Sequence, residues 1–288
     1  MKPIIHMKNK TIGVTGSSGV IGNKFINKFK NNSFIKCTID IQDRKKVFQW
    51  IGDNQFDLLL HFAAIVPINE VNKDKLKAKS VNYIGTKNIV DALVKYKKKK
   101  NIWFFYSSTS HVYKYSKKKI TEKSKIDPIN YYGKTKLMSE KYIIKNLKNN
   151  NIKYCIGRIF SFTDTLQKET FFIPAMFKRL RSKNTSTIQF YDMENKRDFI
   201  STKDIIYAIK TLYEKSCTGI FNIGSGRSVK LSYVINFIAK ILKNKNNIEF
   251  INNKINQNIT CDNTKIKKIG WKAKINIQKI LEEYKKNL

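Results

Sequence analysis

Short, almost continuously apolar runs alternate along the chain with longer segments in which apolar residues recur every three or four positions. The clearest apolar runs lie at residues 11–15, 35–39, 57–64, 101–108 and 154–162. The helical spacing is plainest in SVNYIGTKNIVDALVKY, residues 80–96. Strands that are apolar on both faces are typical of parallel sheets covered by helices. The pattern therefore predicts a doubly wound α/β fold.

The regular alternation ends near residue 160. Beyond it the chain continues as TDTLQKETFFIPAMFKRLRSKN, in which strand and helix patterns no longer follow one another regularly. We expect a dinucleotide-type domain over residues 1–160, to which segments near 197–225 return. A smaller C-terminal lobe over 161–288 is expected to bind substrate.

Charge is the feature of the composition that most changes this picture. The 288 residues include 57 Lys and Arg against 21 Asp and Glu, a formal net charge of +36. The excess is almost all lysine, spread through every segment with many Asn and Ile, as an AT-rich genome produces. A nucleic-acid site would show clustered cations with Arg and stacking aromatics among them. We expect a solvated basic surface that attracts anionic substrates, and no nucleic-acid partner.

Hydropathy and cysteine usage indicate a cytoplasmic protein. Hydrophobic residues make up 41% of the chain, but no apolar run approaches the roughly 20 residues that span a bilayer. The opening MKPIIHMKNK is too polar for a signal peptide, so no membrane partner is expected. The cysteines form no CxxC pair and lie at Cys37, Cys155, Cys217 and Cys261. Neither a disulfide framework nor a metal site is predicted.

A glycine-rich turn follows the first predicted strand. In TIGVTGSSGVIGNKFINKF the strand runs into Gly16, Gly19 and Gly22 and then into an amphipathic helix. Glycines here let the chain turn tightly and let backbone N–H groups at a helix N-terminus approach a pyrophosphate. The pattern predicts a Rossmann-type dinucleotide site formed by Gly16, Ser17, Ser18, Gly19, Val20, Ile21 and Gly22.

The choice of dinucleotide depends on the end of the second predicted strand. Asp40 ends FIKCTID, where an acidic residue accepts hydrogen bonds from the adenosine ribose. Its carboxylate repels the extra phosphate of NADP, so NAD is favoured over NADP. Asp43 is a second candidate for this role or a cap of the next helix. Arg44 favours the phosphate instead, which keeps both cofactors open.

The segment YYGKTKLMSEKYII contains two adjacent tyrosines. Helical periodicity from Tyr131 onward places residues four apart on one face, so Tyr132 lies next to Lys136. Tyr131 has Thr135 at that spacing and is predicted to pack. A lysine ammonium beside a phenol favours phenolate and lowers the pKa of the phenol, which makes it a usable acid or base near neutrality. Tyr132 is therefore the predicted chemical tyrosine.

A hydrophobic strand that ends in hydroxyls, NIWFFYSSTSHVY, supplies the partners that an isolated YxxxK lacks. With it, the sequence resembles the extended short-chain dehydrogenase/reductases, also called the NAD-dependent epimerase/dehydratase family. The resemblance covers nearly the whole chain, and the order and spacing of its motifs make it specific. The matching motifs are TGSSGVIG, HFAA (61–64), NYIGTKN (82–88), SSTSHVY, YYGKTK, RDFISTKD (197–204), GIFNIGSGRSVKL (219–231) and DNTKIKKIGWKAK (262–274).

The resemblance implies roles for the matching residues. Thr109 would bond the substrate oxygen whose proton Tyr132 moves, and Lys136 would also hold the nicotinamide ribose. Arg197 matches an arginine that meets the sugar-nucleotide diphosphate in related epimerases, its alternative being an ion pair with Asp198 or Asp204. Further cofactor contacts are implied at Ala63, Ala64 and Asn82.

Departures from the family pattern limit the reaction. Sugar-nucleotide 4,6-dehydratases carry Asp-Glu where this chain has Ser110 and His111. The missing carboxylates disfavour a conventional dehydration. His111 is a candidate proton donor to the sugar because an imidazole titrates near working pH, or else a histidine satisfied within the turn. The arginine that often precedes the last motif is absent, and Lys254 is its candidate replacement as a point charge.

The sequence thus predicts a nucleotide-sugar epimerase or 4-keto reductase that uses NAD or NADP. Retained NAD with re-reduction of the 4-keto sugar from its other face gives epimerisation, whereas fresh NAD(P)H gives reduction. The alternatives are a reductase of another carbonyl substrate and a non-catalytic dinucleotide-binding protein with a basic partner-binding surface. The resemblance also implies a homodimer and a place in surface polysaccharide synthesis.

Overall fold

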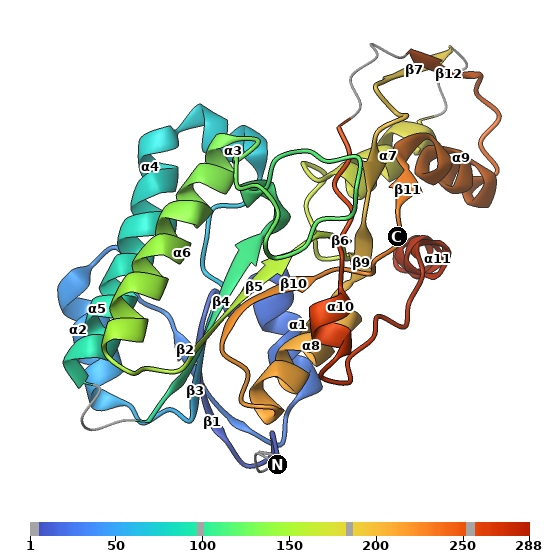
Figure 1. Ribbon diagram of the computed structural model, residues 1–288. Coiled ribbons are helices and arrows are strands. Elements are labelled where there is room, and N and C mark those ends of the chain that lie inside the picture. Colours follow the sequence, from blue (N-terminus) through green and yellow to red (C-terminus); the bar gives the residue numbers. More distant parts are fainter. Residues whose placement is uncertain (1–5, 97–100, 183–186, 252–256) are drawn as a thin grey trace.

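The computed structural model describes residues 6–96, 101–182, 187–251 and 257–288 (Figure 1). A central sheet of six parallel strands has the order β10-β5-β4-β3-β1-β2. The order in which successive strands are added reverses at β1, which has β2 on one side and β3 on the other, and this confirms the doubly wound Rossmann-type fold. The strands are β1 (Thr11–Thr15), β2 (Ser33–Cys37), β3 (Leu58–His61), β4 (Trp103–Thr109), β5 (Tyr154–Ile159) and β10 (Gly219–Ile223).

Successive side chains of the central strands pack against opposite helical layers. In β3, Leu58 joins the core on the side of α1 and α8, whereas Leu59 joins the core on the other side. Phe105 and Phe104 of β4 divide in the same way. This two-sided burial is why the strands are apolar at every position. The helices of the two layers are α1 (Val20–Lys28) and α8 (Thr202–Glu214), then α2 (Arg44–Asp53), α5 (Thr86–Tyr96) and α6 (Tyr131–Asn149).

The helix predicted over 80–96 is not regular. Its first part is a π-helix, Ser80–Gly85, which follows the short helices α3 (Ile68–Lys73) and α4 (Lys75–Lys79) and runs into α5. A Cβ at Gly85 would lie 2.5 Å from the Ile41 side chain, so the helix passes very close to the loop after β2. Asn88 donates to the carbonyls of Ile41 and Gln42 at 3.0 Å. The wide turn therefore ties α5 to the loop that carries Asp40.

The C-terminal part of the chain has a core of its own (Figure 1, upper right). It is built by α7 (Phe172–Arg181), α9 (Leu231–Leu242) and α11 (Ile277–Lys286), and α10 (Thr264–Lys267) lies beside β10. β10 returns to the main sheet beside β5, and the division of the chain near residue 160 stays a prediction. Short paired strands complete this part: β6 (Ser161–Thr163) with β9 (Phe199–Ser201), β7 (Ile188–Tyr191) with β12 (Ile248–Ile251), and β8 (Lys196–Arg197) with β11 (Val229–Lys230).

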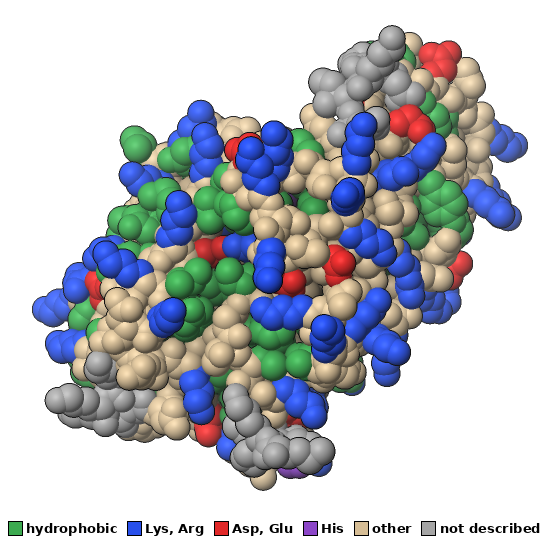
Figure 2. Space-filling view, in the orientation of Figure 1, with side chains coloured by type: hydrophobic (Ala, Val, Ile, Leu, Met, Phe, Trp, Pro, Cys, Tyr) green, Lys and Arg blue, Asp and Glu red, His purple; other side chains and the backbone are tan. Residues whose placement is uncertain are grey.

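The surface reflects the composition. Figure 2 shows lysine and arginine side chains scattered over the whole visible face, with acidic side chains between them. None of the helices in the described part of the chain combines the length and apolar character that crossing a bilayer requires.

Candidate active site

The glycine loop between β1 and α1 forms a backbone cradle. Gly16 has a φ of +67°, and a Cβ there would lie 2.6 Å from the backbone nitrogen of Ala63. A Cβ at Gly22 would lie 2.4 Å from the Gly16 carbonyl oxygen. Gly19 caps α1 without a side-chain hydrogen bond, which leaves the first N–H groups of the helix open to an anion. The cradle fits a dinucleotide pyrophosphate, with Ser17, Ser18, Val20 and Ile21 completing the loop.

A buried histidine fixes the strand ends that face this cradle. His61 ends β3, and its Nδ1 lies 2.6 Å from Thr15 Oγ1 while its Nε2 lies 2.9 Å from Thr86 Oγ1. Thr86 donates its own proton to the Asn82 carbonyl, so His61 donates from Nε2 and accepts at Nδ1. Burial lowers the pKa of His61 from 6.5 to about 3 and keeps it neutral. Sequence reasoning noted His61 only as a motif position and missed its two threonine partners.

Asn82 and the two alanines after β3 lie beside this network. The Asn82 side chain accepts from the Ile65 backbone N–H at 2.8 Å and donates to the Ile65 carbonyl at 3.0 Å and to Thr135 Oγ1 at 3.1 Å. It thus joins the loop after Ala63 and Ala64 to α6. These bonds position the loop, and a direct contact of Asn82 with the cofactor stays a prediction.

The acidic residues after β2 have different surroundings. Asp40 is exposed in the loop that follows β2 and accepts from the Gln42 backbone N–H at 2.9 Å. Asp43 caps α2 by accepting from the Lys46 backbone N–H at 3.1 Å, as its alternative interpretation predicted. Arg44 forms an ion pair with Asp91 of α5. The cation that favoured NADP is therefore engaged, and Asp40 keeps the position suited to a ribose.

Thr109, Tyr132 and Lys136 meet where β4 ends and α6 begins. Thr109 is the last residue of β4, and Tyr132 and Lys136 lie one turn apart near the start of α6. All three are buried, with exposed fractions of 7%, 8% and 2%. Tyr131 packs against the hydrophobic cluster of Val71, Ala78 and Tyr132, which agrees with its predicted packing role. The sequence spacing thus places the predicted catalytic residues together.

The expectation that Lys136 lowers the pKa of Tyr132 is wrong. Burial raises the pKa of Tyr132 well above 10.0, and a hydrogen bond with Thr109 only partly offsets this. Burial also lowers the pKa of Lys136 from 10.5 to about 7, so its positive charge is incomplete at neutral pH. Its ammonium lies over the ring of Tyr106, 4.3 Å from the centroid. The resting phenol is therefore protonated and is a proton donor.

His111 is close to Tyr132 but is not a proton donor with a pKa near neutrality. Burial and the cation of Arg197 lower the pKa of His111 to about 4, which corrects the expectation that it titrates at working pH. Its ring makes an edge contact with the Tyr132 ring, with centroids 5.9 Å apart. A neutral imidazole here can donate or accept a hydrogen bond but does not supply a charge.

The ion-pair interpretation of Arg197 is also wrong. Asp198 accepts from the backbone N–H groups of Ser225, Gly226 and Cys261 instead, at 2.7, 2.8 and 3.1 Å. Asp204 accepts from Ser201 and from backbone groups that precede α11. Arg197 donates to the Lys196 and Gln257 carbonyls and lies over the Tyr115 ring. Its charge is not neutralised by either predicted carboxylate. Lys254 lies outside the described residues.

A buried ion pair behind the site was not predicted. Arg158 of β5 donates from Nε and Nη2 to Glu140 of α6 at 2.6–3.2 Å, and Ser108 of β4 donates to the same carboxylate. Arg158 Nη1 donates to Tyr113 Oη at 2.8 Å, and Tyr113 donates to Asn222 Oδ1 of β10 at 2.7 Å. The network joins three strands to the active-site helix. Its sequence signal is a single arginine inside the apolar run YCIGRIFSF.

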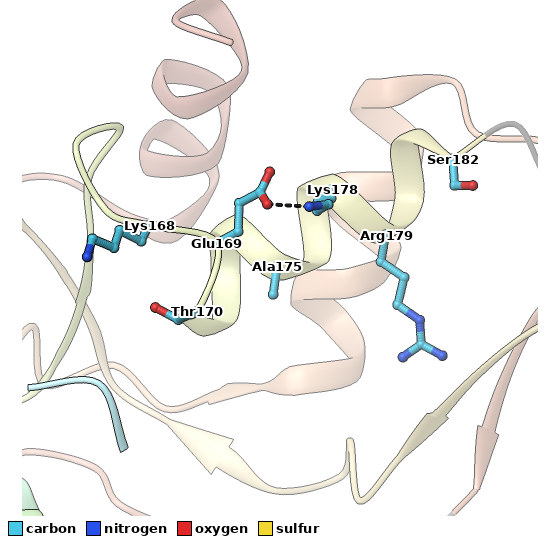
Figure 3. Close-up of a pocket in the computed structure, with 7 residues that line it drawn as sticks. All are labelled: Lys168, Glu169, Thr170, Ala175, Lys178, Arg179 and Ser182. Carbon is cyan, nitrogen blue, oxygen red and sulfur yellow. Dashed lines mark hydrogen bonds and ion pairs between the residues drawn. The ribbon is translucent and has the colours of Figure 1, made fainter. Parts of the chain in front are cut away.

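A surface pocket of about 760 Å³ lies apart from these residues, beside α7 (Figure 3). Glu169 forms an ion pair with Lys178 across it, whereas Arg179 points away and donates to the Gln189 carbonyl at 2.7 Å. No predicted site residue lines it, so it is not the catalytic cleft. The residues that line the pocket are Lys168, Glu169, Thr170, Ala175, Lys178, Arg179 and Ser182.

Within the described ranges, no group of three or more His, Cys, Asp or Glu side chains is placed to hold a metal ion.

Comparison with known proteins gives consistent matches. The model of the family described as GDP-mannose 4,6 dehydratase matches residues 15–284. The chain is 29% identical over 226 residues to the UDP-glucose 4-epimerase of Lactobacillus helveticus, covering 70% of this chain and 66% of that protein. It is 31% identical over 217 residues to a probable UDP-arabinose 4-epimerase of Arabidopsis thaliana, covering 66% of this chain and 52% of that protein. The matched part is thus less than two thirds of either relative.

The fold is shared with a solved structure. The RMD protein of Pseudomonas aeruginosa, in complex with NADPH, aligns with a TM-score of 0.86 at 20% sequence identity. The alignment covers 97% of this chain and 100% of that one. At this identity the match concerns the arrangement of strands and helices.

Proposed function

We propose, because the chain belongs to the GDP-mannose 4,6-dehydratase family, that it is an NAD(P)-dependent epimerase or 4-keto reductase of a nucleotide-activated sugar. One observation carries the proposal. Thr109, Tyr132 and Lys136 converge at the end of β4, at the same edge of the parallel sheet as the glycine cradle that follows β1. Arg197, which neither predicted carboxylate neutralises, supplies a cation for a diphosphate.

The three converging residues divide the proton chemistry. Bound nicotinamide would accept a hydride from, or donate one to, a sugar carbon. Tyr132 moves the proton of the oxygen on that carbon, and Thr109 holds the same oxygen by a hydrogen bond. Lys136 holds the nicotinamide ribose, and its pKa of about 7 lets it exchange protons near neutrality.

Epimerisation and reduction make different demands on Tyr132. The curated relatives named above are 4-epimerases, which supports a cycle of oxidation and re-reduction. The raised pKa of Tyr132 supports reduction, because a protonated phenol is ready to protonate a carbonyl oxygen. Conventional dehydration is not proposed, since Ser110 and His111 stand where the acid and base carboxylates are required.

The cofactor is proposed to be NAD rather than NADP. Asp40 is exposed in the loop after β2, where its negative charge would disfavour a 2′-phosphate. Arg44 would offset this charge, but it is paired with Asp91.

A homodimer through α5 and α6 is also proposed. Ile84 is 37% exposed beside these helices, and Tyr83 packs edge-on against Tyr142 on the same surface. Buried thiols at Cys155 and Cys261 support a reducing, cytoplasmic location. Participation in surface polysaccharide synthesis is proposed on the family resemblance.

The experiment is a screen of UDP-, GDP- and dTDP-hexoses and their 4-keto derivatives, preceded by mass analysis of cofactor released on denaturation. Retained NAD with interconversion of C4 epimers establishes an epimerase. An empty protein that consumes NAD(P)H with a 4-keto sugar establishes a reductase. Turnover of only non-sugar carbonyl compounds would contradict the proposal, and so would nicotinamide binding without any turnover.

A further inference from the structure

The orientation of one side-chain amide at the start of α6 is fixed by the helix itself. Asn130 caps α6, and its Oδ1 accepts from the Gly133 backbone N–H at 2.8 Å. A backbone N–H can only donate, so the atom that faces Gly133 must be the oxygen. The Asn130 nitrogen then faces the other way, 2.9 Å from His111 Nδ1.

The amide orientation determines where His111 carries its proton. The Asn130 NH₂ group has only protons to offer, so His111 Nδ1 must be the acceptor and is unprotonated. A neutral imidazole with a bare Nδ1 carries its proton on Nε2. Among the described residues, no protein group forms a hydrogen bond with His111 Nε2. This N–H is therefore available to a ligand.

Several contacts hold the His111 ring beside the reacting groups. The backbone N–H of His111 donates to Thr109 Oγ1 at 3.2 Å, and its carbonyl accepts from the Ile129 N–H at 3.1 Å. A Cβ on Gly133 would lie 2.2 Å from that carbonyl, so glycine permits the close approach. The ring meets the Tyr132 ring at an interplanar angle of 83°. His111 therefore lies on the same side as the phenol that moves the proton.

We propose that His111 is a substrate-binding hydrogen-bond donor, which presents Nε2–H to a hydroxyl or carbonyl oxygen next to the reacting sugar carbon, and that Asn130 is its positioning residue. The inference rests on the proposed function. It narrows the substrate to sugars that present an acceptor oxygen to His111, the residue that stands in this chain where 4,6-dehydratases carry a catalytic carboxylate. Burial of the ring lowers the pKa of His111, and the nearby cation of Arg197 lowers it further, so the imidazole stays neutral.

The first test reads the tautomer directly in the protein without substrate. Long-range ¹H–¹⁵N correlation spectra resolve the imidazole nitrogens, and the chain has 3 histidines. The His111 signals are assigned by their loss in His111→Gln. We expect a neutral Nε2–H imidazole at neutral pH. An Nδ1–H tautomer or an imidazolium would overturn the proposal, and this result does not depend on finding the substrate.

The second test reverses the tautomer while keeping the helix cap. Asn130→Asp retains an acceptor for the Gly133 N–H but turns a carboxylate oxygen towards His111. Because this oxygen can only accept a hydrogen bond, it requires a proton on His111 Nδ1. Asn130→Ser retains the cap and leaves Nδ1 without this partner. The free energy of unfolding of both variants should lie within about 1 kcal/mol of the wild-type value, because Asn, Asp and Ser cap helices similarly.

In Asn130→Asp the new carboxylate raises the pKa of His111 from its value of about 4. Activity is therefore measured at about pH 8, so that the imidazole is neutral in the variant as well as in the wild type. On a sugar nucleotide that the wild type converts, kcat/KM should fall about 10- to 100-fold in Asn130→Asp and less in Asn130→Ser. In a His111→Ala background, Asn130→Asp should cause no further loss. Equal losses with and without His111, or full activity of Asn130→Asp with a reversed tautomer, would overturn the proposal. Lack of turnover by the wild type on any sugar nucleotide would instead contradict the proposed function.

Discussion

Replacing Glu140 with Gln tests how the core holds the active-site helix. The Glu140 carboxylate binds Arg158 through Nε and Nη2 and also accepts from Ser108, and the paired side chains are 1% and 4% exposed. Gln has nearly the same shape but leaves the guanidinium without a counter-charge among apolar side chains. Breaking a buried pair in this way costs about 3–5 kcal/mol.

The assay is equilibrium unfolding in urea, followed by tryptophan fluorescence and circular dichroism. Glu140→Gln should lower the free energy of unfolding by about 3–5 kcal/mol, whereas the paired change Glu140→Leu with Arg158→Met should recover most of this loss. Glu194→Gln is the matched control, because its ion pair with Lys230 is 44% and 51% exposed and should contribute under about 1 kcal/mol. Equal effects of Glu140→Gln and the control would refute the reasoning.

Other changes test the cradle, the cofactor choice and the acid stability. Gly22→Ala places a Cβ 2.4 Å from the Gly16 carbonyl and should abolish NAD binding in calorimetric titration, and unchanged affinity would contradict the cradle. Asp40→Asn should raise the affinity for NADP relative to NAD about tenfold or more, measured by the same titration, because one repulsive charge is removed. His61 has a folded pKa of about 3 against 6.5 in the unfolded chain, so the unfolded state binds the extra proton first and stability falls as pH falls from about 6.5 towards about 3. His61→Gln should flatten this part of the stability curve, and an unchanged slope would show that other groups cause it.

The fold could be predicted because its strands are buried on both faces. Leu58, Leu59 and Leu60 reach opposite helical layers, so the apolar run itself reports a covered parallel sheet. The π-helix over Ser80–Gly85 could not be predicted, because it depends on the close approach of Gly85 to Ile41, which is distant in sequence. β2 also lies two residues earlier than expected, at Ser33–Cys37 rather than 35–39.

Helical spacing predicted which tyrosine lies beside Lys136, but it did not predict the protonation states. Spacing along α6 places Tyr132 and Lys136 on one face, whereas their pKa values depend on burial, which periodicity does not measure. The Glu140–Arg158 pair and the Asn130–His111 bond join residues from different elements. Such pairings depend on tertiary packing and become visible only in three dimensions.

The proton-transfer role of Tyr132 is the central claim, and Tyr132→Phe tests it most directly. Wild type and variant are compared on the same sugar nucleotide, with product followed by chromatography and cofactor affinity by titration in parallel. The account predicts that turnover falls by about 100-fold or more while cofactor affinity is retained, because only the phenolic proton has been removed. Turnover by Tyr132→Phe at the wild-type rate would contradict it.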